Sequence, residues 1–143
     1  MLSWEELSSD ALSIEGVVGS ALGDWKSGAC LAFKGTKDLA FPERDLPLVI
    51  TGDAELIRAQ VKNARSLNLR PEEILIITKT QCDLIRLINL RSLFIYLALD
   101  REKGNLAMAR VKLDQIAEKI EEWLAHKLNQ TSAKGVSQSK GCP

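Results

Sequence analysis

The sequence has few of the residues from which metal centres are built. It contains one histidine, His126, and three cysteines at positions 30, 82 and 142. Structural zinc sites take cysteine and histidine ligands from closely spaced pairs, which this arrangement does not provide. An odd number of widely separated cysteines also argues against a disulfide framework and favours reduced thiols in the cytoplasm. We therefore expect a cytoplasmic protein with no metal site and no cofactor.

Long hydrophobic runs and an excess of either charge are also missing. The longest apolar run, Leu93–Leu99, is much shorter than the roughly 20 residues of a membrane-spanning helix. The first ten residues lack the basic flank and apolar stretch of an export signal. The 19 basic side chains balance 19 acidic ones, whereas nucleic-acid-binding domains are usually basic. We expect neither a membrane span nor a nucleic-acid partner.

Motifs of nucleotide-binding and hydrolytic enzymes are absent as well. The glycine-containing stretch Gly16–Gly23 matches neither of the common phosphate-binding glycine motifs. No serine occupies a nucleophile elbow, and the titratable residues do not cluster in a catalytic pattern. The sequence therefore predicts that the protein is not an enzyme.

The hydrophobic patterns predict one α+β domain over residues 1–128 and a disordered, Ser-, Gly-, Lys- and Gln-rich tail over residues 129–143. Ser3 and Glu6 match a capping box for the first helix. The predicted helices are Trp4–Leu12, Ala54–Leu67 and Asn105–Leu128. The predicted strands are Val17–Gly23, Ala29–Lys34, Glu73–Thr78, Cys82–Ile88 and Leu93–Leu99. The order α-β-β-α-β-β-β-α predicts a five-stranded antiparallel sheet sandwiched by helices.

Two local features refine this fold. Leu93–Leu99 lacks the apolar–polar alternation of a half-exposed strand, so it is predicted to be a central strand covered on both faces. The segment Gly35–Gly52 contains Pro42 and Pro47, and it is predicted to be non-helical with a short extended piece near its end. Asp53 is then expected to be the N-cap of the middle helix.

The predicted middle helix has more apolar surface than one subunit hides, because a lone helix covers only part of a five-stranded face. Two interpretations remain open at this point: a second copy of the chain covers this surface, or the Gly35–Gly52 segment folds over it. The first favours a homodimer. Its predicted interface consists of Leu56, Ile57, Gln60, Val61 and Ala64 on the helix, and Ile74 and Ile76 on the neighbouring strand.

Two stretches of the chain resemble the roadblock / dynein light chain family. Residues 13–28, SIEGVVGSALGDWKSG, are similar to the first strand and hairpin of that family. Residues 93–113, LFIYLALDREKGNLAMARVKL, are similar to its last strand and final helix. The matching residues in the second stretch are Asp100, Arg101, Asn105, Leu106, Ala107, Ala109 and Arg110. The resemblance covers about Leu2–Leu128 and implies a profilin-like, roadblock-like architecture.

The resemblance also implies a function. Family members pair through their middle helix and the neighbouring strand, and they bind Ras-like small GTPases or join larger assemblies; some bacterial relatives activate a polarity GTPase. We therefore predict a non-catalytic homodimeric scaffold or regulatory protein that binds a Ras-like small GTPase or a signalling or motility assembly. Asp100, Arg101 and Lys103 form a candidate partner-binding corner, or else a merely solvated one. The alternative function is a small-ligand sensing domain with a pocket under Gly35–Gly52.

Overall fold

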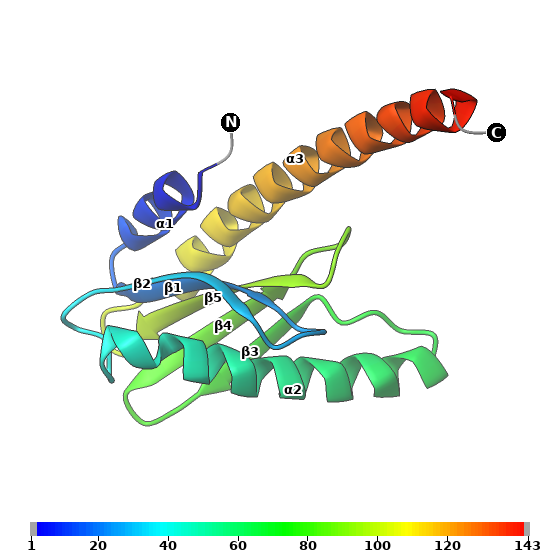
Figure 1. Ribbon diagram of the computed structural model, residues 1–143. Coiled ribbons are helices and arrows are strands. Elements are labelled where there is room, and N and C mark those ends of the chain that lie inside the picture. Colours follow the sequence, from blue (N-terminus) through cyan, green and yellow to red (C-terminus); the bar gives the residue numbers. More distant parts are fainter. Residues whose placement is uncertain (1–2, 142–143) are drawn as a thin grey trace.

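The protein folds into a five-stranded antiparallel sheet between two layers of helices, as the computed structural model shows (Figure 1). Residues 3–129 are described in full, and the backbone of the last helix is followed to Gly141. The elements are α1 (Trp4–Leu12), β1 (Val17–Asp24), β2 (Cys30–Gly35), the 3₁₀ turn η1 (Glu43–Asp45), α2 (Leu46–Ser66), β3 (Glu73–Ile77), β4 (Gln81–Leu87), β5 (Leu93–Asp100) and α3 (Leu106–Gly141). The predicted fold class and element order are confirmed. The predicted disordered tail lies outside the fully described residues and stays a prediction.

The sheet has the strand order β2-β1-β5-β4-β3, which places β5 at its centre. Side chains at residues 95, 97 and 99 of β5 pack against α1 and α3, and those at 94, 96 and 98 pack under α2. Residues 94–99 are all buried. The prediction of a central strand covered on both faces is therefore confirmed, and its lack of alternation follows from having a helical layer on each side.

Helix α2 begins at Leu46, eight residues before the predicted start at Ala54. Pro47 lies in its first turn, where a missing N–H costs nothing because that group has no intrahelical partner. The prediction that the chain is non-helical up to Gly52 is therefore wrong for its last seven residues. Asp53 is consequently not an N-cap but a buried residue in the middle of the helix.

The ends of the other helices depend on packing as much as on capping. Ser3 is the N-cap of α1, but its side chain makes no capping hydrogen bond, so the predicted capping box with Glu6 does not form. The helix starts there because Leu7 and Ala11 bury against the sheet. Asn105 does cap α3, since its Oδ1 accepts a hydrogen bond from the Met108 N–H at 3.1 Å.

None of the described helices is long and apolar enough to cross a membrane.

Candidate functional site

The outer side of α2 and the edge strand β3 together form what we call the α2–β3 surface. The structure brings the predicted interface residues together here, but with different exposures. Leu56 and Gln60 are exposed, whereas Val61, Ala64, Ile74 and Ile76 are half-buried. Ile57 is completely buried against its own sheet. Ile57 therefore supports this surface from beneath and, contrary to the prediction, is not available to a second copy.

Strand β3 is an open edge of the sheet. It pairs with β4 from Glu73↔Arg86 to Ile77↔Cys82, and no described strand pairs with its other side. Ile77 at its end is 58% exposed. An apolar edge strand with free N–H and C=O groups is a template for pairing with another chain.

The segment that could have covered this surface packs elsewhere. Leu39 is buried against the β1–β2 side of the sheet, where a Cβ added at Gly19 or Gly35 would meet its side chain. The Ala40 N–H donates a hydrogen bond to Gln81 Oε1 at 3.3 Å, at the start of β4. Leu56 remains 36% exposed. Of the two interpretations left open by the sequence, the structure therefore does not support coverage of Leu56 by the 35–52 segment.

A buried polar group lies beneath α2, where sequence reasoning did not expect one. Gln81, Asp83 and Tyr96 point from the sheet into the α2 cluster, and Asp53 lies in the buried part of the helix. Gln81 Nε2 donates to Asp83 Oδ1 at 2.8 Å, and Tyr96 Oη donates to the same oxygen at 3.0 Å. Asp53 Oδ2 is buried and has no hydrogen-bond partner in the described structure. The available signal was that Asp83 alternates in phase with the apolar residues of β4.

The burial of these groups changes their acidity. Desolvation, together with the nearby Asp83 carboxylate, raises the pKa of Asp53 to about 7. Desolvation also raises the pKa of Asp83, although the hydrogen bonds from Gln81 and Tyr96 act in the opposite direction. Among the described residues no group of three or more His, Cys, Asp or Glu side chains could hold a metal ion. We interpret Asp53 as a carboxyl group that takes up a proton near neutral pH.

The charged corner at the end of β5 is held by its own backbone. Asp100 Oδ1 accepts hydrogen bonds from the N–H groups of Glu102 and Lys103, both at 2.9 Å, and these bonds lower the pKa of Asp100. Arg101 Nη1 donates to Thr78 O at 3.1 Å, which ties the corner to the β3–β4 turn. Asp100 and Arg101 thus shape the corner, and Lys103 is exposed. Their role in partner binding stays a prediction.

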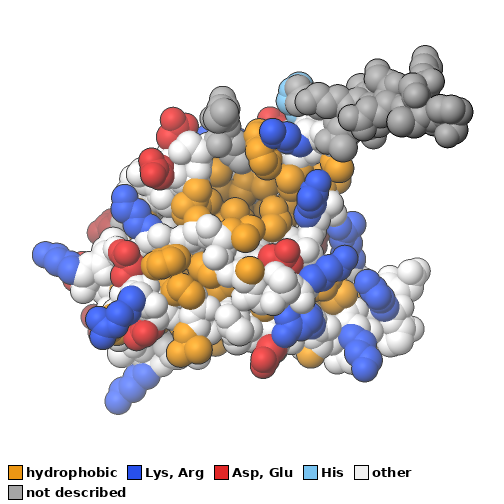
Figure 2. Space-filling model, in the orientation of Figure 1, with side chains coloured by type: hydrophobic (Ala, Val, Ile, Leu, Met, Phe, Trp, Pro, Cys, Tyr) orange, Lys and Arg blue, Asp and Glu red, His pale blue; other side chains and the backbone are white. Residues whose placement is uncertain are grey.

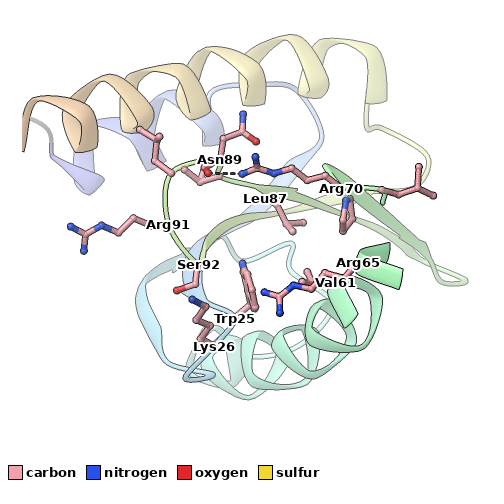
Figure 3. A pocket seen from close by; sticks show the side chains of 13 residues that line it. Trp25, Lys26, Val61, Arg65, Arg70, Leu87, Asn89, Arg91 and Ser92 are labelled. Atoms are coloured by element: carbon pink, nitrogen blue, oxygen red, sulfur yellow. Dashed lines mark hydrogen bonds between the residues drawn. The ribbon is translucent and has the colours of Figure 1, made fainter. Parts of the chain in front are cut away.

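A concave pocket lies between the end of α2 and two sheet turns, and we call it the basic pocket (Figure 3). Its volume is about 450 Å³. Four basic side chains line it, namely Lys26, Arg65, Arg70 and Arg91, and Trp25, Val61, Leu69 and Leu87 are among its apolar residues. Sequence reasoning missed this pocket because its residues come from three separate segments. A second hollow, of about 570 Å³, lies along residues 35–43, where the ligand-sensor alternative placed its pocket.

Apolar side chains also gather on the opposite layer of the molecule. Figure 2 shows them over the sheet, between α1 and α3. Trp4, Leu22 and Trp123 are among the partly buried residues that pack against the α1–α3 core cluster. Because these side chains continue a buried core, this area is primarily the rim of that core.

Comparisons with known proteins identify the fold. No protein-family model matches the sequence, and no curated protein sequence matches it either.

Solved structures do match, at low sequence identity. The gliding protein MglB from Thermus thermophilus superposes with a TM-score of 0.70 at 19% identity, covering 82% of this chain and 85% of that one. A roadblock/LC7 domain from Streptomyces avermitilis has a TM-score of 0.71 at 9% identity, covering 87% and 98%. An MglB described in a tetrameric arrangement has a TM-score of 0.70 at 20% identity, covering 82% and 85%. The chain therefore has the roadblock/LC7 fold.

Proposed function

We propose that the chain is a non-catalytic homodimeric regulatory protein of the cytoplasm that binds a Ras-like small GTPase, alone or within a motility assembly. The observation that carries this proposal is the open edge of β3 beside the partly exposed apolar side of α2 in a roadblock/LC7 fold. The sequence resemblance to the roadblock family independently supports the same pairing surface.

The dimer follows from symmetry and from the edge strand. A twofold dimer brings the same patch of both copies together. Pairing β3 with its copy would extend the sheet across both subunits and satisfy the free edge. It would also bring together the two copies of Leu56 and Gln60, which are exposed on the adjoining side of α2. An apolar edge that attracts other chains is thereby closed.

A GTPase partner is favoured because such a dimer would provide a protein-binding surface and not a set of catalytic side chains. The family resemblance implies that binding positions groups that the GTPase itself supplies, so that the regulator needs no nucleophile or metal of its own. The similarity to a protein described as a gliding protein supports a role in motility. Lys103 and the adjoining corner are the proposed partner contacts, because residues 101–103 are exposed and charged and directly follow the central strand.

The GTPase proposal is tested by direct binding. Purified Ras-like GTPases of the source organism are loaded with GDP or with a non-hydrolysable GTP analogue and titrated onto the immobilised chain in biolayer interferometry. We expect saturable binding of one GTPase with a preference for one nucleotide state. Absence of binding by every such GTPase in both states would contradict the proposal.

A further inference from the structure

We propose that the basic pocket binds a small organic phosphate, with its phosphate groups on the arginine side chains and its apolar or aromatic part against Trp25. This site does not depend on the proposed GTPase partner. The pocket is built where the end of α2 and the loop after it, the β1–β2 turn and the β4–β5 turn meet. Its volume of about 450 Å³ suits a mononucleotide-sized molecule, since ligand pockets measure roughly 300–1,000 Å³.

The charge of the pocket is strongly unbalanced. Four basic side chains and no acidic ones are found among its lining residues. Within the described part of the chain, the side chains of Arg65 and Arg91 make no hydrogen bond and no ion pair. Arg70 Nη2 donates to the Asn89 carbonyl oxygen at 2.5 Å, and its other N–H groups remain available. Cations gathered around one hollow create a positive potential that an anion relieves.

Two acids near the pocket, Asp24 and Glu121, are not among its lining residues, although Asp24 attracts Lys26 electrostatically. Asp24 Oδ1 accepts hydrogen bonds from the N–H groups of Lys26 and Ser27 and from the Ser92 hydroxyl, so it organises the β1–β2 turn. Glu121 on α3 accepts a hydrogen bond from the Asn89 N–H at 3.2 Å. The C-terminal end of α2 adds only a partial negative charge, about half an elementary charge. The basic side chains that line the pocket outweigh this partial charge.

The side chains that line the pocket indicate the class of ligand. Guanidinium groups donate paired N–H groups that match phosphate oxygens, which favours a phosphate over a simple halide. Figure 3 shows Trp25, Lys26 and Arg65 on one side of the hollow and Arg70 on the other, with the Arg91 side chain directed away from these four residues. Trp25 is half-buried and packs against the α2 core cluster, and Lys26 Nζ lies 5.7 Å from the centre of its ring. An aromatic base or another apolar group would pack on this wall.

Two structural explanations account for parts of the cluster only. Arg65, in the last turn of α2, complements the helix dipole. Arg70 satisfies a backbone carbonyl of the β4–β5 turn. Neither explanation accounts for Lys26, which lines the same hollow.

The pocket and the exposed part of the proposed dimer seam lie on different sides of α2. On its pocket side, α2 faces the β1–β2 turn, where Arg58 Nη1 donates to Trp25 O at 2.6 Å. Leu56 and Gln60 lie on the other side of the helix, as their helical spacing from Arg58 and Arg65 requires. Leu56 and Gln60 are therefore not pocket residues, whereas Val61 belongs both to the α2–β3 surface and to the pocket lining.

The test is isothermal titration calorimetry of the full chain with ADP, pyrophosphate and adenosine as probes. We expect ADP to bind more tightly than pyrophosphate, and adenosine not to bind. Arg65→Ala and Arg70→Ala should each weaken ADP binding by about tenfold, because each removes a charge-assisted contact. Lys62→Ala, on the same helix but outside the pocket, is the matched control and should leave binding unchanged. Trp25→Ala should weaken ADP binding while leaving pyrophosphate binding intact.

Several results would overturn the inference. One is the absence of binding heat from both ADP and pyrophosphate at millimolar concentration. Another is an equal loss of ADP affinity in Lys62→Ala and Arg65→Ala. A third is binding of adenosine as tight as that of ADP. Sedimentation with phosphatidylinositol-4-phosphate vesicles distinguishes the source of the phosphate. Binding to vesicles without binding to ADP or pyrophosphate would reject a soluble ligand. Circular dichroism melts establish that each variant is folded.

Discussion

Tyr96 donates its phenolic hydrogen to Asp83 Oδ1 at 3.0 Å, inside an otherwise apolar cluster under α2. Gln81 donates to the same oxygen at 2.8 Å. The neighbouring Asp53 receives no such compensation, since its buried Oδ2 has no described partner. An unpaired buried carboxylate is costly, and protonation removes most of that cost. The stability of the fold should therefore depend on the protonation of Asp53.

This dependence has a defined sign. The pKa of Asp53 is about 7 in the folded protein, well above the value of about 3.9 expected for the unfolded chain. Between these values the folded state binds a proton that the unfolded state has lost, so the contribution of Asp53 to stability falls as pH rises and levels off above about pH 7. Asp53→Asn should remove this dependence and raise the free energy of unfolding at pH 8 by on the order of 2 kcal/mol, after a discount for solvent screening.

The measurement is urea unfolding of both proteins at pH 5 and pH 8. Glu55→Gln, an exposed acid-to-amide change on the same helix, serves as the control. The difference between Asp53→Asn and the unmodified chain should grow from pH 5 to pH 8. A difference that is the same at both pH values would show that Asp53 is not the responsible group.

The proposed dimer surface predicts an effect of charge at Leu56. Leu56→Arg should split the dimer, because it would place two copies of an unpaired guanidinium at the seam. Val111→Arg, on α3 across the sheet, changes an exposed apolar residue in the same way and should leave the dimer intact. Sedimentation velocity of the two variants separates these outcomes. A dimer that persists in Leu56→Arg would show that the interface does not lie on this side of α2.

Two glycines allow the charged corner to close against the start of β1. Gly16 has a φ of +85°, and a Cβ added there would collide with the Gly104 backbone. Gly16→Ala should therefore destabilise the fold by about 2–4 kcal/mol. Gly52→Ala is the contrasting control, because this helical position is open and alanine should stabilise α2 by about 0.5–1 kcal/mol. Thermal unfolding measures both, and equal effects would contradict this account of the corner.

The corner also makes a prediction about the partner. Lys103 is exposed and lies between the backbone-fixed Asp100 and the start of α3. Lys103→Glu should weaken binding of the small GTPase by about tenfold through charge reversal at the contact, without changing the melting temperature. The same substitution at Lys62 is the control. An unchanged affinity of Lys103→Glu for the GTPase would show that the corner is a solvated turn and not a partner contact.

The elements with a clear hydrophobic period were predictable from the sequence. The uninterrupted apolar run of β5 identified the central strand, because only a strand covered on both faces lacks alternation. The start of α2 was missed because proline usually ends a helix, and only its place in the first turn makes it compatible with one. Ser3 matched a capping box, yet packing of Leu7 and Ala11 determines where that helix begins.

The candidate sites were less predictable, for a physical reason. The resemblance pointed to the side of α2 that faces β3, but a helical period could not show that Ile57 is completely buried by its own sheet. Asp53 matched a cap locally and became a core residue only once the helix extended back to Leu46. Lys26, Arg65 and Arg70 line one pocket because the fold brings separate connections together, which no single stretch of sequence encodes.

The central claim is that two copies of this chain associate through the α2–β3 surface. Multi-angle light scattering of the unmodified protein at micromolar concentration tests it most directly. The account predicts a single species with twice the chain mass of 15.8 kDa. A species with the mass of one chain, unchanged as the concentration rises, would contradict it.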